Sequence, residues 1–475
     1  MIQCPSCSGA VKYNITSGKL SCDYCQSEYD PYSFDEHQGD AEERDYFETN
    51  IFTCPQCGGE IMSDDNTAAG FCSFCGASTV LNSRIQKKKR PSHIIPFCIT
   101  KEQCKELYHE RIKKAIYLPS AFRDFGAIEE FRGIYMPYWS YRVEQKGELS
   151  GTGEKEHRSG NYRIIDHYAL SGTLDADIAG ITHDAAATFS DDISERLEPF
   201  DVHDTKTFTP AFLSGFYADI ADVDENVYRK DAISFAQGQT YGAVSTNDVF
   251  SGHNADFPHN LGIPARITEV KATMFPVWFL SYRYMDRVAY AAVNGQNGKI
   301  VADLPADPKK YLIGTLLLSI PAFLLFQIIL YLTAPTMLII TSICALVCMI
   351  CSFVWRSKLK TRSQFLNDAG YQFMQSQKTE EAVDGNATVK NAEQKRTGPS
   401  AGPASVWPLA LLILAIVISV LVSFSGSIHD PLYYGLAIAD AILIFINGVS
   451  ILRIYNLAVS RPLPQFDRKG GDDRA

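Results

Sequence analysis

Long apolar runs fill the C-terminal third of the chain, whereas the first 310 residues mix polar and apolar positions. Residues 311–355 contain no Asp, Glu, Lys or Arg. At about 1.5 Å per residue, Tyr311–Thr333 is long enough to cross a hydrocarbon core of about 30 Å. Pro335 begins a second run that ends at Trp355. Residues 311–355 therefore predict transmembrane helices 1 and 2, joined by a tight turn.

Residues 407–452 predict transmembrane helices 3 and 4, as the runs Trp407–Phe424 and Leu432–Leu452. The turns at 333–335 and 425–431 contain no Lys or Arg. Basic residues flank the opposite ends of the runs, at Lys309, Lys310, Arg356, Lys358, Lys360, Arg362, Arg453 and Arg461. Because basic flanks stay on the cytoplasmic side, the pattern predicts a multi-pass protein of the cell membrane. We expect both termini, the flexible loop 356–406 and the tail 453–475 in the cytoplasm.

Asp440 is the only charged residue inside the four runs, and Asn447 lies seven positions further along the same helical face. A carboxyl group in a membrane is costly and usually faces other helices. One interpretation is a proton or cation relay. The other is a protonated carboxyl that hydrogen-bonds a second helix, and the lack of a basic partner favours it.

Residues 91–305 have the composition of a globular domain and predict a cytosolic α+β domain. Thr100–Gln103 is a capping box, which predicts a helix start. Leu107, Ile112 and Ile116 follow on one helical face before Pro119 stops the helix.

Two aromatic segments of this domain share a Pro-x-Trp…Tyr-Arg pattern, Ile134–Arg142 and Met274–Arg283. The shared pattern predicts two equivalent strands, with an internal duplication as one explanation. Val288–Val293 and Lys299–Val301, separated by Asn294-Gly295, predict a β-hairpin.

Eight of the thirteen cysteines form two Cys-x-x-Cys pairs in each of two units, fifty positions apart. In both units fourteen residues, which predict a short hairpin, separate the pairs. Four thiolates suit a tetrahedral Zn²⁺ ion and leave no open position for substrate, so we expect two structural zinc sites. The predicted ligands are Cys4, Cys7, Cys22 and Cys25 in residues 1–30, and Cys54, Cys57, Cys72 and Cys75 in residues 51–82.

Redox motifs and rubredoxin-like iron sites are the alternatives for these cysteines. The identical spacing of both units argues against redox pairs, and the short spacer favours zinc over iron. Two small β zinc ribbons are therefore expected in a reducing compartment.

The charge around the ribbons is acidic. Residues 26–53 carry nine acidic side chains and the single basic Arg44, and the chain has a net charge of -10. Phosphate binding requires basic residues, so nucleic acid is an unlikely partner and protein contact is favoured. Residues 31–50 are predicted as an acidic linker. Lys87–Arg90 is predicted as a solvated linker, with contact to anionic lipid headgroups as a further interpretation.

The chain contains none of the common catalytic motifs. It has no phosphate-binding loop, no Gly-x-Ser-x-Gly, and no His-Glu-x-x-His, since His109-Glu110 lacks the second histidine. We therefore expect no enzymatic activity and no catalytic residues.

Four further segments, together with the ribbons and the Pro-x-Trp strands, resemble a family of bacterial membrane proteins with TFIIB-type zinc ribbons. These segments are His93–Phe97, Phe189–Phe200, Leu213–Tyr217 and Val293–Lys299. The resemblance covers roughly residues 1–355 and implies a fold and a topology but little chemistry. Some members are labelled as replication helicase-like, and this chain lacks the ATP-binding loop that a helicase needs.

The sequence thus predicts a multi-domain protein with two zinc ribbons, an α+β domain and four transmembrane helices. We expect a non-enzymatic scaffold or sensor that binds a cytosolic protein partner at the lipid bilayer. A transport component that uses Asp440 and a membrane-tethered nucleic-acid-binding protein are the alternatives.

Overall fold

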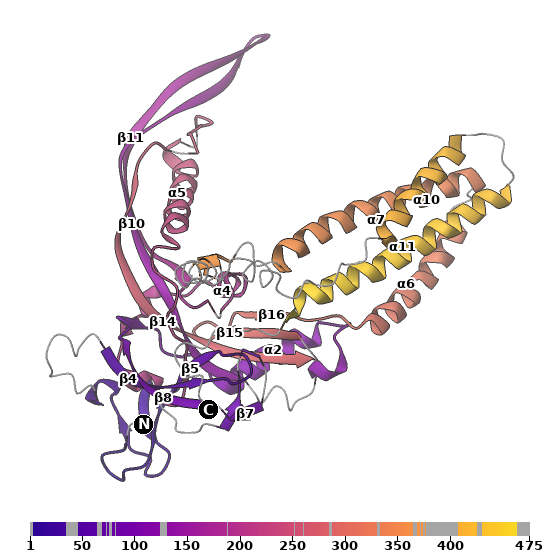
Figure 1. Ribbon diagram of the computed structural model, residues 1–475. Helices are drawn as coiled ribbons and strands as arrows, with labels where there is room; N and C mark the ends of the chain where they lie inside the picture. The colour runs from indigo at the N-terminus through magenta and orange to yellow at the C-terminus, as the bar shows by residue number, and fades with distance from the viewer. Residues whose placement is uncertain are drawn as a thin grey trace, which may run out of the picture.

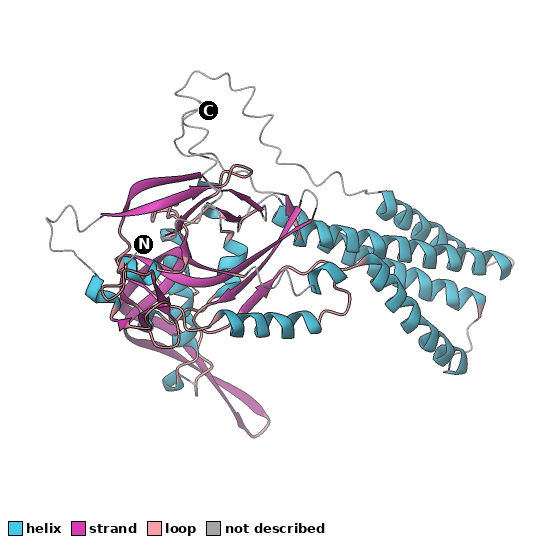
Figure 2. Cartoon of the chain, turned by 90° about the horizontal axis from the view of Figure 1, so that it is seen from below, coloured by secondary structure: helices cyan, strands magenta, loops and turns pink. Residues whose placement is uncertain are grey.

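The computed structural model consists of a β-rich body, a long β-hairpin and a helical bundle (Figure 1). Figure 2 shows the helices of the bundle gathered at one end of the molecule and the strands at the other. The structure describes residues 3–34, 46–63, 69–72, 74–75, 78–80, 82–123, 131–187, 189–250, 252–259, 261–284, 287–329, 333–363, 368–370, 372–373, 376, 407–424 and 430–462.

The first cysteine unit forms a separate three-stranded sheet of β1 (Val11–Asn14), β2 (Lys19–Cys22) and β3 (Glu28–Tyr29). The predicted hairpin between the cysteine pairs is confirmed, because β1 and β2 pair antiparallel. The unit is attached to the body by Tyr13, whose N–H donates to the carbonyl of Ser214 at 3.0 Å. The hydroxyl of Ser214 donates to the carbonyl of Val11 at 2.7 Å.

The second cysteine unit is part of the main sheet, which differs from the predicted small ribbon. β5 (Glu60–Ser63) pairs with β4 (Tyr46–Thr53) and with β13 (Tyr217–Ala218) of the middle domain. β6 (Ala69–Phe71) pairs instead with β7 (Ser78–Val80). The hairpin expected between the cysteine pairs is therefore not seen among the described residues of this unit.

The two predicted linkers around this unit contain strands that pair with each other. β4 begins inside the predicted linker 31–50, and β8 (Asn82–Lys89) covers the basic segment. The two strands pair antiparallel, with Glu48 opposite Lys87 in the register. The acidic and basic segments therefore contribute strands to the main sheet.

The two Pro-x-Trp segments each form part of a strand, as predicted, and the structure shows that these strands are neighbours in the body. β10 (Arg132–Ser159) and β14 (Ala265–Tyr284) pair antiparallel, and Met136 lies opposite Phe275. Trp139 and Trp278 each donate an indole N–H to a backbone carbonyl, at 2.9 and 2.8 Å. The predicted hairpin that follows is also confirmed, because β15 (Arg287–Asn294) pairs antiparallel with β16 (Ile300–Ala302).

The body contains three described α-helices: α2 (Lys101–Lys113), α4 (Asp191–Leu197) and α5 (Arg229–Ser245). The predicted capping box is confirmed, since Thr100 and Gln103 satisfy each other's backbone N–H groups. The assignment of Ile116 to the buried face of α2 was wrong, because the helix ends at Lys113 and Ile116 is 73% exposed.

Shorter elements complete the body. They are the strands β9 (His93–Ile94) and β12 (Lys206–Thr207), and the 3-10 helices Pro31–Phe34, Ser120–Arg123, Val202–Asp204, Pro210–Leu213 and Asp248–Phe250. β9 runs parallel to β14, which brings the His93–Phe97 segment beside the second Pro-x-Trp strand.

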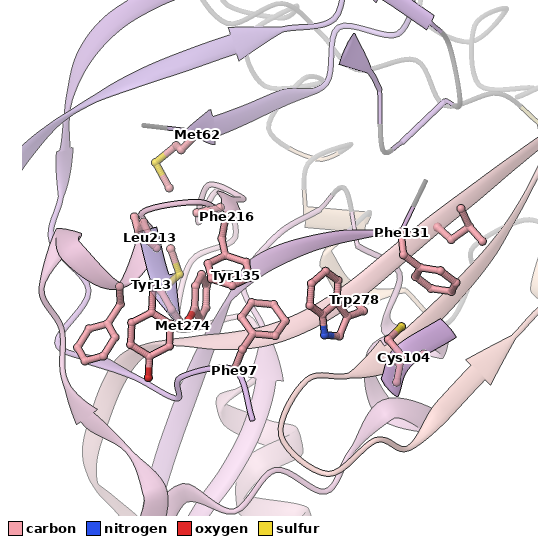
Figure 3. Packing of buried hydrophobic residues seen from close by; sticks show 14 of the residues in the cluster. Tyr13, Met62, Phe97, Cys104, Phe131, Tyr135, Leu213, Phe216, Met274 and Trp278 are labelled. Atoms are coloured by element: carbon pink, nitrogen blue, oxygen red, sulfur yellow. The ribbon is translucent and has the colours of Figure 1, made fainter. Parts of the chain in front are cut away.

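Aromatic side chains from distant parts of the chain form the main core (Figure 3). Phe97 lies at its centre, with ring centroids 4.5 Å from Phe216, 5.0 Å from Tyr135 and 5.0 Å from Trp278. Gly295 is required beside these rings, since a Cβ at this position would lie 2.6 Å from Phe97.

A long hairpin of β10 and β11 (Tyr162–Asp184) projects from the body (Figure 1). Its sequence has little apolar alternation because both faces of its outer part are exposed. The backbone ladder between β10 and β11 holds the strands together, and exposed cross-strand ion pairs, such as Arg163 with Glu156 at 2.6 Å, add little to it.

Four helices form the bundle: α6 (Pro308–Ile329), α7 (Ala334–Ser363), α10 (Trp407–Phe424) and α11 (Asp430–Val459). Among the described residues, two segments are long and apolar enough to cross a membrane, Ala334–Ser357 and Pro431–Val459. The apolar part of α10, Pro408–Val422, is shorter. The structure therefore supports two membrane-spanning helices, and the predicted four-helix topology stays a prediction.

The predicted cytosolic tail 453–475 is structured at its start. α11 continues to Val459, and β17 (Arg461–Pro462) then pairs with β15 of the body. Residues 463–475, and most of the predicted loop 356–406, lie outside the described residues.

Candidate metal centres and the polar cluster between the apolar helices

The four sulfurs of the first cysteine unit converge on one point. Cys4 Sγ lies 3.5 Å from Cys25 Sγ, and Cys7 Sγ lies 3.5 Å from Cys22 Sγ. All four ligand atoms lie within 4.8 Å of one another. Cys4 and Cys22 are buried, whereas Cys7 and Cys25 are exposed.

The second unit repeats this geometry in a buried setting. Cys54 Sγ and Cys75 Sγ are 3.8 Å apart, and Cys57 Sγ and Cys72 Sγ are 3.7 Å apart. All four cysteines are buried.

These distances fit a zinc ion in each unit. Four sulfurs placed about 2.3 Å from one tetrahedral ion lie about 3.8 Å from each other. The observed separations of 3.5 to 3.8 Å match this value. Both cysteine groups could thus hold metal ions, in agreement with the predicted pair of zinc sites.

The turn after each first cysteine pair has the same backbone geometry in both units. Ser8 and Gly58, fifty positions apart, adopt φ values of 60° and 76°. Each donates its N–H to the carbonyl of the first cysteine, Cys4 or Cys54, at 2.8 Å. The left-handed conformation closes a tight turn and brings two thiols to one point. This repeat in conformation supports the repeat seen in the sequence.

The first site also contains a hydrogen-bond donor to a ligand sulfur. The hydroxyl of Tyr29 lies 3.3 Å from Cys4 Sγ, and this contact lowers the pKa of the Cys4 thiol to about 6. The thiolate is the form that binds zinc, so Tyr29 favours the ligand state of Cys4.

Strands of the body hold the loops of the second site. The hydroxyl of Tyr290 donates to the carbonyl of Phe74 at 2.6 Å, and that of Ser281 donates to the carbonyl of Cys72 at 3.5 Å. Phe74 is buried in the cluster that surrounds the cysteines. The equivalent residue of the first unit, Tyr24, is 89% exposed. The second site is therefore an internal part of the sheet, while the first presents an aromatic side chain to solvent.

Asp440 and Asn447 lie at buried polar contacts inside the helical bundle. The carboxylate Oδ2 of Asp440 accepts hydrogen bonds from Ser419 at 3.0 Å and Ser342 at 3.4 Å. These serines belong to α10 and α7, so Asp440 of α11 links three helices. Asn447 donates to Ser352 of α7. This geometry agrees with the hydrogen-bonding interpretation of Asp440, whose role stays a prediction.

Replacing Asp440 tests that interpretation. Asp440→Asn keeps an acceptor for Ser419 and Ser342, so we expect bundle stability close to that of the parent protein. Asp440→Leu leaves both hydroxyls without this acceptor, and we expect a loss of about 1 kcal/mol of interhelical stability. Thermal unfolding in detergent measures both. An Asp440→Asn protein that folds normally but loses its cellular activity would favour the relay interpretation.

No sequence pattern indicated the buried contact between the body and the segment that follows α7. The carboxylate of Asp191 accepts from the N–H of Ala369 at 2.7 Å and from the hydroxyl of Tyr228 at 3.0 Å. Asp184 is buried nearby, and desolvation, followed by the charge of Asp191, raises its pKa well above the ordinary value. Burial thus favours the uncharged form of Asp184, which lets the two carboxyl groups lie close together in this interior.

Comparisons with known proteins give one relative. No protein-family model and no solved structure match the chain. The chain is similar to a Bacillus subtilis (strain 168) protein named "Uncharacterized protein YdjG", with 26% identity over 315 residues. The match covers 65% of this chain and 91% of the relative. The two cysteine clusters agree with the resemblance drawn from the sequence, and the TFIIB type of the ribbons stays a prediction.

Proposed function

We propose that this protein is a membrane-anchored, non-enzymatic zinc-ribbon scaffold that binds a cytosolic protein partner. The observation that carries the proposal is the hydrogen-bonded connection between the β-rich body, with its two cysteine clusters, and the apolar helices. Asn456 of α11 exchanges two hydrogen bonds with the backbone of Ala306, at 2.8 and 2.7 Å. Tyr455 donates to the carbonyl of Leu304 at 3.1 Å. These contacts join the body directly to α11, as an anchored binding platform requires.

The exposed tip of the first ribbon supports protein contact rather than nucleic-acid contact. Tyr24 is 89% exposed between the cysteines of the second pair. Aromatic side chains are enriched where proteins bind each other. The neighbouring Asp23 and the acidic segment after the ribbon oppose phosphate binding.

A photoreactive amino acid at Tyr24 of the full chain tests this function in intact cells. We expect a crosslink to one cytosolic protein, and no such crosslink from the matched position Val249, which is 77% exposed on the body. Crosslinks to nucleic acid alone, or equal crosslinking from both positions, would contradict the scaffold.

The four-helix topology belongs to the same proposal. In it, α6 and α10 cross the membrane beside α7 and α11, with both termini in the cytoplasm. The basic flanks support this orientation, because Lys309 and Lys310 precede α6 and Arg453 lies near the end of α11.

Thiol labelling checks the topology. A cysteine at Thr333, exposed in the turn before α7, should react with an impermeant reagent added outside intact cells. A cysteine at Thr246, exposed on the body, should react only after lysis. Labelling of the parent protein under the same conditions measures the background from its native cysteines. The reverse labelling pattern would place the body outside the cell.

Transport stays the second candidate function, because Asp440 Oδ1 is buried without a hydrogen-bond partner in the described structure. Proton flux into proteoliposomes, compared between the parent and Asp440→Asn, separates the two candidates. Flux that depends on the carboxyl group would favour transport over the scaffold.

A further inference from the structure

One edge of the long hairpin is open along most of its length. In the part of the chain that the structure describes, β11 pairs with β10 and with no other strand. Among the described residues, no backbone hydrogen bond connects Leu174–Ile181 to anything beyond β10. Over Leu174–Ile178, where the pairing with β10 is regular, alternate N–H and C=O groups therefore point away from the sheet, and such an edge is a template for another strand.

A groove of about 510 Å³ follows this open edge. Its first wall is β11, from which eight consecutive residues, Leu174–Ile181, line the groove. A groove on one face of a strand would be lined mainly by every second side chain, since side chains alternate between faces. The unbroken run places the groove along the backbone edge.

The second wall of the groove is α5, which runs beside the hairpin in Figure 1. A stripe of exposed residues four positions apart faces the groove: Phe235, Gln239, Ala243 and Asn247. Phe235 is 53% exposed, although it lies next to the buried Ala236. A large apolar side chain beside an open strand edge is suited to cover the side chains of an added strand.

The two faces of β11 differ in chemistry at this groove. Leu174 and Ile178 pack on the apolar clusters beneath α5. Asp175 and Asp177 point to the other face, where Asp175 pairs with Lys146 at 3.4 Å and Asp177 pairs with Arg142. Asp175 is nonetheless 73% exposed in its side chain. An added strand would meet apolar groups on one face and carboxylates on the other.

We propose that an extended segment of the partner protein, with alternating apolar and basic residues, adds to β11 as a further strand beneath α5. This inference rests on the proposed scaffold function and specifies how the partner is held. Backbone hydrogen bonds to Leu174–Ile181 supply affinity. Specificity comes from contact of the apolar side chains with Phe235 and of the basic side chains with Asp175.

A synthetic peptide tests the proposal with the zinc-loaded full chain in detergent micelles. The probe is a fluorescent peptide of about ten residues in which valine and lysine alternate, long enough to cover the open edge. The control peptide has the same length and prolines at every second position, which removes backbone donors. Fluorescence anisotropy should show binding of the first peptide and none of the second.

Phe235→Glu and Tyr162→Glu form a matched pair of variants. Tyr162 is 78% exposed at the tip of the same hairpin and does not line the groove. We expect Phe235→Glu to weaken peptide binding about tenfold or more, and Tyr162→Glu to leave it unchanged. Hydrogen exchange should slow at the amides of 174–181 on binding, which reports directly on the edge.

Equal effects of both variants, absence of binding, or unchanged exchange at 174–181 would each overturn the proposal. Concentration-dependent dimers that protect the same amides without peptide would assign the edge to a second copy of this chain. If the peptide fails while the Tyr24 crosslink persists, the strand proposal is wrong and the scaffold function stands. If the crosslink fails while the peptide binds, the scaffold function is wrong and the edge of β11 still binds an added strand.

Discussion

Cys72→Ser is expected to remove one of two zinc ions and to destabilise the β-rich body by several kcal/mol. Structural zinc stabilises small cysteine-rich units by about 10–16 kcal/mol of apparent binding energy, and a lost thiolate forfeits much of it. Cys72 is buried in a site whose loops are hydrogen-bonded to β14 and β15, so the loss extends into the main sheet. Metal analysis and thermal unfolding of the full chain in detergent measure both effects.

Cys22→Ser is the matched control, because Cys22 is the equivalent ligand of the first site. It should also lower the zinc content by one ion, but the structural loss should fall on the three-stranded sheet and on the part of the core that packs against it, where Tyr13 contacts Phe212. A chelator should remove zinc first from the first site, because its ligands Cys7 and Cys25 are exposed to solvent. Two zinc ions in Cys72→Ser, or release from both sites at one rate, would contradict these expectations.

Phe97→Ala is expected to lower the free energy of unfolding by about 3–5 kcal/mol. The ring is buried and contacts Phe216, Tyr135 and Trp278, so its removal leaves a cavity that these large rings cannot fill. Denaturant unfolding followed by tryptophan fluorescence measures the loss, because Trp278 lies beside the cavity.

Tyr24→Ala is the control for this core substitution. It removes an aromatic ring that is 89% exposed, and surface substitutions of this kind change stability by less than about 0.5 kcal/mol. Comparable losses in Phe97→Ala and Tyr24→Ala would show that the aromatic cluster does not carry the stability of the body.

Several elements were predictable because their signals are local. The capping box at Thr100 and Gln103 involves two residues three positions apart, and the structure forms both of its hydrogen bonds. The Pro-x-Trp segments are dense in aromatic and β-branched residues, which favour strands. In the helical bundle, the apolar runs were also a local signal and predicted helices. Their apolar length does not decide by itself which of these helices cross a membrane.

The partners of the strands were not predictable from these local signals. β4 and β8 lie in segments whose charge suggested linkers, yet the two strands pair antiparallel with each other. The open groove also escaped detection, since it lies between β11 and α5, which are far apart in sequence. The contact of Asp191 with Ala369 joins segments separated by most of the middle domain and two helices.

The sequence by itself determined the two four-cysteine clusters that could hold metal ions, the apolar helices and the principal strands of the body. Each of these depends on residue type and short-range spacing, which the geometry of zinc, of a helix or of a strand imposes directly. Only the tertiary structure decided that the second metal site is built into the main sheet, that Asp440 joins three helices, and that β11 keeps an open edge. These features depend on hydrogen bonds and packing between distant residues, for which no local pattern specifies the partner.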